Sequence, residues 1–195
     1  MSTTAPPRPI TPDDLLHMPD EGSGFELVDG ELKELNASMQ SSRIAGMIFS
    51  EFQTYSVAHH PAWVFPERTS YQCFPDDPNR VRRPDVSIIP LTRMTREQYY
   101  EDGHCRIAPD LVVEVVSPND NAEDLEEKIG EWLAAGTRIV WVVYPSIQSI
   151  RIHRGDGGYA FLRSADTLTA EGVLPGFSCP VADLFRLPGE PAPSV

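Results

Sequence analysis

The sequence predicts an α/β domain in which a mixed central sheet carries helices on its faces and an N-terminal hairpin is added. Residues 25–35 place Asp29-Gly30 between two strand-like segments, which is typical of a hairpin turn. Apolar residues at helical spacing occupy 41–57 and predict a long helix. Three short apolar segments between turn-forming residues are typical of buried strands: 86–89, 111–113 and 138–144.

The first third of the chain is expected to contain a short helix, the hairpin and the long helix. Thr11 is a suitable N-cap for the short helix, Pro12 fits its first turn, and Asp14 occupies the capping-box position. A stripe of apolar side chains indicates the long helix: Ile44, Met47, Ile48, Phe52 and Tyr55. After this helix the pattern changes, and it predicts strands at 63–65 and 71–74 and a turn at 75–79.

The rest of the chain alternates strands with helices, and two residues mark the boundaries of its main helix. Asn121 can cap a helix over 122–135, and Gly136 can end it. The segment 138–144 is apolar on both faces, so we expect it at the centre of the sheet. The other predicted elements are a strand after Asp85, a helical turn at 96–100, a strand carrying Glu114, a hairpin with strands 148–154 and 158–163, and a segment over 173–185 that packs back without regular structure.

Length and composition indicate one domain. The chain has 195 residues, of which 41% are hydrophobic and 23% charged, so it is long enough for a full core and ordinary in composition. We expect a single domain over 11–187 with Pro-rich, disordered tails at 1–10 and 188–195. No apolar run reaches the roughly 18 residues that suggest a membrane span, and the N-terminus does not resemble a secretory signal. Three cysteines lack paired spacing, so free thiols in a reducing cytoplasm are expected: Cys73, Cys105 and Cys179.

The charge balance opposes a simple nucleic-acid-binding function. The formal net charge is −13, and an acidic protein repels the phosphate backbone of DNA. A basic rim on this acidic body and an ordinary solvated strip are both consistent with the arginines that lie near Asp85 in the sequence: Arg80, Arg82, Arg83, Arg93 and Arg96.

Two acidic residues stand next to or within predicted buried strands. Asp85 directly precedes Val86-Ser87-Ile88-Ile89, and Glu114 follows Leu111-Val112-Val113. A carboxylate in such a place is unfavourable unless it is paired, protonated or bound to a metal. Two of them on neighbouring strands can converge on one divalent cation, which is the layout of a metal-dependent nuclease core.

Lys128 is a candidate third component of such a site. Phosphodiester cleavage benefits from a cation near the attacking water or the non-bridging oxygen. Lys128 borders the core-facing stripe of its helix, one turn from both Asp124 and Trp132, and can point along the sheet towards the two carboxylates. The alternative is an exposed Asp124–Lys128 pair worth about a few tenths of a kcal/mol. Helix geometry alone favours this alternative.

These motifs, taken in order, resemble those of a known family. Pro84-Asp85 followed by Glu114-Val115-Val116 resembles the Pro-Asp…(Asp/Glu)-x-Lys nuclease superfamily, which implies a restriction-endonuclease-like fold. From about residue 10 to residue 187 the chain is more narrowly similar to the Uma2 (DUF820) family of restriction-type endonucleases. The matching segments are 25–31, 84–87, 109–118, Asp124 with Lys128, and 135–145. Each motif is weak alone, whereas their order and spacing are specific.

The resemblance implies roles for the matching residues. Asp85 and Glu114 would bind Mg²⁺ or Mn²⁺ with help from the backbone carbonyl of Val115. The lysine that the superfamily places two residues after the second acid is replaced here by Val116, and the resemblance implies that Lys128 substitutes from the helix. Two further acids are expected near the site: Glu26 and Asp124.

Two positions depart from the family pattern. The segment Gln40-Ser41-Ser42-Arg43 lacks a histidine that is often found there, and Trp132 stands where tyrosine is common. Tryptophan keeps the packing of tyrosine but removes its hydroxyl group. Neither change affects the expected metal ligands.

The resulting hypothesis is an Mg²⁺- or Mn²⁺-dependent endonuclease that hydrolyses DNA. Asp85 and Glu114 hold the ion, and Lys128 steadies the charge that develops in the transition state. The rival hypothesis is a catalytically weak or inactive binding module that keeps the nuclease fold, and the net charge of −13 and Val116 both favour it. DNA is the expected partner, and a homodimer and a cytoplasmic location are also expected.

Overall fold

The computed structural model describes residues 8–59 and 61–190, and in this part of the chain six strands form one mixed sheet. The strand order is β3-β4-β5-β6-β7-β8, where β5 and β6 are parallel and the other neighbours are antiparallel. The strands span Ala62–Pro66 (β3), Val86–Pro90 (β4), Leu111–Val115 (β5), Ile139–Tyr144 (β6), Ser149–Arg154 (β7) and Tyr159–Arg163 (β8). The predicted mixed central sheet is therefore confirmed.

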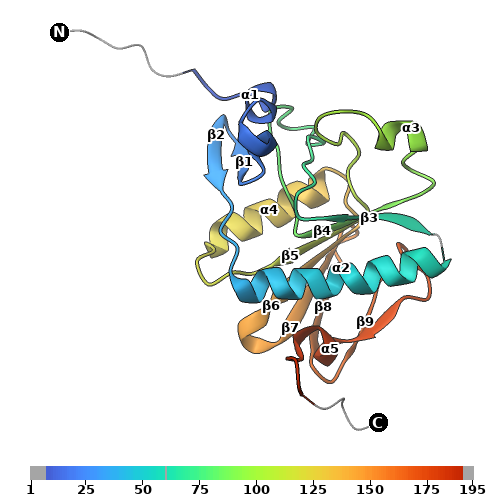
Figure 1. Cartoon of the computed structure of the whole chain (residues 1–195). Helices are drawn as coiled ribbons and strands as arrows, with labels where there is room; N and C mark the ends of the chain where they lie inside the picture. Colours follow the sequence, from blue (N-terminus) through green and yellow to red (C-terminus); the bar gives the residue numbers. More distant parts are fainter. Residues whose placement is uncertain (1–7, 60, 191–195) are drawn as a thin grey trace.

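The two long helices cover opposite faces of this sheet (Figure 1). Helix α2 (Met39–His59) packs Ile44, Ile48 and Phe52 against one face, and α4 (Ala122–Ala134) packs Ile129 and Trp132 against the other. Strands β4, β5 and β6 lie between the helices and are buried on both faces. This explains why their sequences are nearly continuous apolar runs.

Helix α4 has the boundaries that its sequence predicts. The side chain of Asn121 accepts a hydrogen bond from the backbone N–H of Glu123 at 2.8 Å, which caps the helix. Gly136 follows the last turn with a φ of 101°, a conformation that favours glycine. The direction of α4 across β5 and β6 is thus set by short-range signals at both of its ends.

The N-terminal hairpin consists of β1 (Phe25–Val28) and β2 (Glu31–Glu34). Asp29 and Gly30 have φ values of 52° and 78°, as the predicted two-residue turn requires. Leu27 forms a backbone bridge with Val81 and packs with Leu15 in a small separate core. The hairpin is therefore fixed beside the segment that leads to Asp85, together with α1 (Pro12–Leu16) and the short helix η1 (Pro19–Gly22).

Two sequence predictions of local structure are wrong. Residues 71–74 do not form a strand, because only Tyr71 pairs, through isolated bridges to Arg82 and Cys105. The segment at 173–185 was expected to be irregular, but it contains a short strand and a helix whose partners lie elsewhere in the chain. These elements are β10 (Ser178–Pro180), which pairs with β9 (Thr167–Thr169), and α5 (Val181–Phe185).

The remaining elements are α3 (Arg96–Tyr99), where a helical turn is predicted, and the short helix η2 (Pro145–Ile147). The tails at 1–10 and 188–195 lie partly outside the described residues, which exclude 1–7 and 191–195. Within the described part, the backbone N–H of Ile10 donates to the carbonyl of Gly30 at 3.0 Å. Among the described helices, none is long and apolar enough to cross a membrane.

Candidate metal centre and active site

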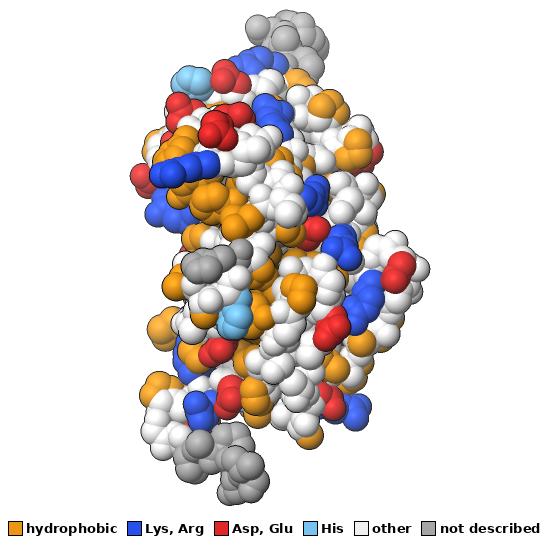
Figure 2. Space-filling model, turned by 90° about the vertical axis from the view of Figure 1, so that its right-hand side faces the viewer, with side chains coloured by type: hydrophobic (Ala, Val, Ile, Leu, Met, Phe, Trp, Pro, Cys, Tyr) orange, Lys and Arg blue, Asp and Glu red, His pale blue; other side chains and the backbone are white. Residues whose placement is uncertain are grey.

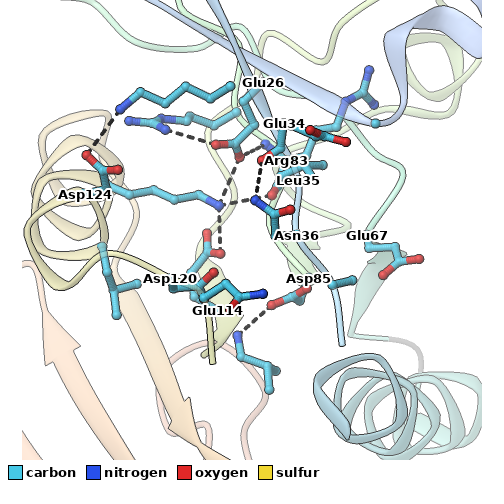
Figure 3. A pocket seen from close by; sticks show the side chains of 18 of the residues that line it. Glu26, Glu34, Leu35, Asn36, Glu67, Arg83, Asp85, Glu114, Asp120 and Asp124 are labelled. Atoms are coloured by element: carbon cyan, nitrogen blue, oxygen red, sulfur yellow. Dashed lines mark hydrogen bonds and ion pairs between the residues drawn. The ribbon is translucent and has the colours of Figure 1, made fainter. Parts of the chain in front are cut away.

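A cleft of about 850 Å³ opens at the end of β5, and both acids of the predicted pair line it. The Asp85 N–H donates to the carbonyl of Val113 at 3.1 Å, which extends the β4–β5 pairing by one residue. Glu114 is the next residue along β5, so the two carboxylates meet at one place (Figure 3). Sheet register alone thus brings together two acids that are distant in sequence.

Asp85 faces the cleft and is held by a backbone hydrogen bond. The N–H of Val115 donates to Asp85 Oδ2 at 2.6 Å. Burial raises the pKa of Asp85 to about 6, although this hydrogen bond and the charge of Lys128 oppose the rise. Glu67 and Asp120 add to it, because further negative charge disfavours ionisation. The position is unfavourable for a free carboxylate and would favour a bound cation.

Glu114 is only 6% exposed, and both of its carboxylate oxygens accept hydrogen bonds from α4. Lys128 Nζ lies 2.8 Å from Glu114 Oε2, and Trp132 Nε1 lies 2.9 Å from Glu114 Oε1. Burial raises the pKa of Glu114 to about 7, Lys128 opposes this, and the charges of Asp85 and Glu26 reinforce it. Glu114 is therefore firmly oriented in an environment of excess negative charge.

Lys128 points into this site and uses all three of its N–H donors there. Its Nζ atom lies 2.8 Å from Glu114 Oε2, 2.9 Å from Glu26 Oε1 and 3.2 Å from the carbonyl oxygen of Arg83. Burial lowers the pKa of Lys128, but the two carboxylates outweigh burial and the net direction is upward. The alternative Asp124–Lys128 pair is not formed, because Asp124 contacts Lys33 Nζ at 3.3 Å across the cleft.

Glu26 is part of a buried network that holds Lys128 in place. Its Oε1 accepts from Lys128 and from the N–H of Arg83 at 2.7 Å, and its Oε2 accepts from Arg82 at 2.9 Å. Arg82 also donates to Glu131 Oε2 at 2.6 Å. The structure thus places Glu26 beside the predicted site and gives it a structural connection to α4 that its sequence position does not reveal.

For three of the five arginines near Asp85, the structure supports neither of the two readings left open by the sequence, a basic rim or a solvated strip. Arg80, Arg82 and Arg83 are only 8%, 2% and 4% exposed and are committed to internal partners. Arg80 and Arg82 pair with buried carboxylates, which would be unfavourable without a partner. The guanidinium of Arg83 donates to backbone carbonyls, so all three groups serve the fold. Of the other two, Arg93 pairs with buried Asp110, and Arg96 lies on exposed α3. Acidic and basic side chains are interspersed on the side of the molecule in Figure 2.

The oxygen ligands at the cleft fit a hard divalent cation. Mg²⁺ is commonly bound through one or two carboxylates while it keeps several waters. Asp85 and Glu114 supply such a pair, and Val115 lines the same cleft. Within the described residues, no group of three or more His, Cys, Asp or Glu side chains is placed to hold a metal ion. An ion here would therefore depend on these two carboxylates, a backbone carbonyl, water and substrate oxygens.

Sequence reasoning missed three residues that act on the site through other side chains. Trp132 was expected only to pack, yet its indole N–H contacts Glu114. Arg82 and Glu131 connect Glu26 to the far side of α4. Trp132 has a usable signal, since it follows Lys128 by one helical turn and shares its face. The Arg82–Glu131 pair has no signal in the sequence, because the two residues are far apart along the chain.

Together, the mixed sheet, the flanking helices and this carboxylate–lysine cleft define a protein with a nuclease-like α/β fold. Residues 12–182 match the model of the Uma2 family, which is described as "Putative restriction endonuclease". Because the match covers most of the chain, the protein belongs to the Uma2 family.

A solved structure supports the same fold assignment. A "putative nuclease belonging to DUF820" from Anabaena variabilis ATCC 29413 superposes with a TM-score of 0.75 at 22% sequence identity, over 91% of this chain and 98% of that one. At this level of identity the likeness concerns the fold. No curated protein matches the sequence.

Proposed function

We propose that the cleft is the active site of a divalent-metal-dependent nuclease that hydrolyses phosphodiester bonds in DNA. The observation that carries the proposal is the meeting of Asp85, Glu114 and Lys128 at one cleft, with Lys128 Nζ 2.8 Å from Glu114. Family membership supports a nuclease. The expected homodimer and cytoplasmic location stay predictions.

Each residue has a separate role in this proposal. Asp85 and Glu114 would hold Mg²⁺ or Mn²⁺ together with the carbonyl of Val115, and the ion would polarise the phosphate and its bound water. Lys128 keeps its positive charge beside Glu114 and is placed to stabilise negative charge that develops on a phosphate oxygen. Because Lys128 arrives from α4, it supplies the cation that Val116 cannot.

Glu26 and Asp124 have supporting roles in the same proposal. Glu26 is a positioning residue, since it contacts Lys128 Nζ at 2.9 Å and leaves one lysine N–H for Glu114. Asp124 lines the cleft and pairs with Lys33, which joins α4 to the hairpin at the entrance. Neither residue needs to contact the ion.

The test is nicking of supercoiled plasmid DNA in the presence of Mg²⁺ or Mn²⁺. Glu114→Gln and Lys128→Met should each abolish nicking that the wild type performs. Lys33→Met is a matched control, because Lys33 also lines the cleft but lies on the hairpin and contacts only Asp124 among these acids. Wild-type protein that neither nicks DNA nor binds either metal in calorimetry would refute the proposal.

One observation favours the rival function, a nuclease-fold binding module without catalysis. Both oxygens of Glu114 already accept hydrogen bonds, from Lys128 and Trp132, which satisfies a buried carboxylate without a metal. Calorimetry separates the two functions. A binding module would show no Mg²⁺ affinity that depends on Asp85, whereas the nuclease requires it.

A further inference from the structure

The sheet face beyond α4 carries aromatic and basic side chains in cross-strand rows. Ile150 and Ile152 of β7 pack in the core under α2, so the alternate residues of β7 point to the α4 side. Register then aligns Arg151 with Phe161 and His153 with Tyr159. Six side chains on this face form what we call the β7–β8 platform: Tyr144, Arg151, His153, Tyr159, Phe161 and Arg163.

The outer strand of the platform is open to solvent. Strand β8 is an edge of the six-stranded sheet formed by the described residues. Tyr159 is 58% exposed and Phe161 37% exposed, and Arg163 is exposed beside them. Large aromatic rings exposed on one sheet face add little to the core, and such exposed groups mark interaction sites when they are clustered.

The rings and cations of the platform already lie against one another. The guanidinium of Arg151 lies 4.7 Å from the centre of the Tyr144 ring, and that of Arg163 lies 5.2 Å from the centre of the Phe161 ring. The surface therefore presents planar groups and positive charge together. Nucleobases stack on aromatic rings and on arginine planes, whereas phosphates pair with the guanidinium charge.

The charge of the platform differs from that of the whole chain. Its six side chains include two arginines and no acid, although the chain as a whole has a formal charge of −13. Burial lowers the pKa of His153, which favours the neutral form of this ring. Glu126 of α4 is the neighbouring acid whose charge acts on His153 and Tyr144. The two arginines thus give this face a positive charge that can pair with phosphate, although the chain as a whole is acidic.

The platform lies close to the candidate active site. Glu114 pairs with Val142 in the parallel β5–β6 register, and Tyr144 follows at the same end of β6. Ser149 and Arg163 continue this row across β7 and β8. Between the row and the cleft lies the N-terminal end of α4, where Asn121 lines the cleft. A nucleic-acid strand that leaves the cleft over this end of α4 would reach Tyr144 first.

We propose that the β7–β8 platform binds a single-stranded segment of nucleic acid, with bases stacked on Tyr159 and Phe161 and phosphates paired with Arg151 and Arg163. The proposal deepens the proposed nuclease function and rests on it for its biological meaning, because it names single-stranded or locally opened nucleic acid as the substrate class. Its test needs no cleavage.

The test is fluorescence anisotropy of a labelled 12-nucleotide oligothymidine at low salt, with EDTA present so that no metal acts. Phe161→Ala should weaken binding by about 5- to 150-fold, the effect expected for one lost base stack. Tyr100→Ala is the matched control, because Tyr100 is 68% exposed but follows α3, whose Tyr99 stacks on Trp63 of the opposite edge strand β3. It should bind like the wild type. Arg163→Gln should lower the log–log salt slope by about 0.7.

Three results would overturn the proposal. One is wild-type protein that does not bind the oligonucleotide at low salt. Another is equal binding by Phe161→Ala and Tyr100→Ala when both keep the wild-type circular dichroism spectrum and melting temperature. The third is a sedimentation experiment in which Phe161→Ala dissociates a dimer and leaves oligonucleotide binding unchanged, because a second copy then covers the platform. A protein that binds the oligonucleotide but never cuts DNA would refute the proposed nuclease function alone.

Discussion

Trp132 donates its indole N–H to Oε1 of Glu114 across 2.9 Å, and both side chains are buried. The contact fixes one oxygen of the carboxylate, and Lys128 holds the other. A hydrogen bond to a buried charged group contributes about 1.5–3 kcal/mol. The tryptophan at this position therefore orients Glu114 as well as packing against the sheet.

Replacing Trp132 by phenylalanine tests this contact. Trp132→Phe should lower the free energy of unfolding by about 1.5–3 kcal/mol more than Trp141→Phe, because only the first change removes a hydrogen bond to a charged group. Trp141 is a matched control, since it is also fully buried and its indole nitrogen has no partner among the described residues. Urea denaturation of both variants at a pH well above the Glu114 pKa of about 7, where this carboxylate is ionised, measures the difference. Equal losses would show that the Trp132 hydrogen bond contributes nothing.

The charge of Glu26 should make the stability of the fold pH-dependent. Burial by itself would raise the pKa of Glu26, but Lys128, Arg82 and the N–H of Arg83 hold it below its ordinary value of 4.5. Since the folded pKa is the lower one, the stabilisation is fully present above pH 4.5 and is lost as the pH falls through the folded pKa.

Glu26→Gln should therefore lose about 3–5 kcal/mol at pH 7, because Lys128 and Arg82 lose a buried partner. Its melting temperature should also change less than that of the wild type between pH 5 and pH 3. Glu34→Gln, on the exposed end of the hairpin, should behave like the wild type. Thermal melts across this pH range check both expectations, and parallel curves for wild type and Glu26→Gln would contradict them.

Asp85 should be unfavourable for folding when no metal is bound. Its carboxylate is buried near other acids, and its pKa of about 6 reflects this environment. Asp85→Asn can still accept the hydrogen bond from Val115, so in EDTA at pH 7 it should raise the free energy of unfolding by about 1–3 kcal/mol. Asp76→Asn, which alters an exposed acid paired with Arg80, should not be stabilising.

Adding Mg²⁺ should remove most or all of the stability advantage of Asp85→Asn over the wild type. The wild type should gain about 2.7 kcal/mol when Mg²⁺ is present at a hundred times its dissociation constant, and Asp85→Asn should gain nothing. Thermal shift measurements with and without EDTA provide the comparison. Equal stabilisation of both proteins by Mg²⁺ would show that the ion does not bind at Asp85.

Arg82 should matter for folding and not for attraction of DNA. Arg82→Ala leaves Glu26 and Glu131 without their shared partner in the core and should lower the free energy of unfolding by about 3–5 kcal/mol. Arg96→Ala, on exposed α3, should change stability by about 0.5 kcal/mol or less. Denaturation with guanidinium chloride measures the free energy of unfolding of both variants. Arg82→Ala with wild-type stability would show that the buried network is dispensable.

Local signals in the sequence predicted most of the elements correctly. The Asp29-Gly30 turn, the Asn121 cap and the Gly136 stop act over a few residues, so a single segment contains the whole signal. The predictions at 71–74 and 173–185 were wrong because the structure of these segments depends on partners elsewhere in the chain. Tyr71 is buried by distant partners and pairs only through single bridges, and β10 pairs with β9 across a long connection.

The sequence by itself determined the mixed sheet, the two acids on its central strands and the family resemblance, because apolar runs and capping residues are local patterns. Tertiary structure alone decided which way Lys128 points, since Asp124 four residues earlier is an equally reachable partner along the helix. The buried charge of Glu26 settles that choice, because it completes the lysine's three hydrogen bonds inside the site. Tertiary structure also decided that Arg80 and Arg82 serve the core, because the buried carboxylates of Glu26 and Glu131 are distant in sequence and need them. The guanidinium of Arg83 is likewise held inside, by backbone carbonyls of distant segments.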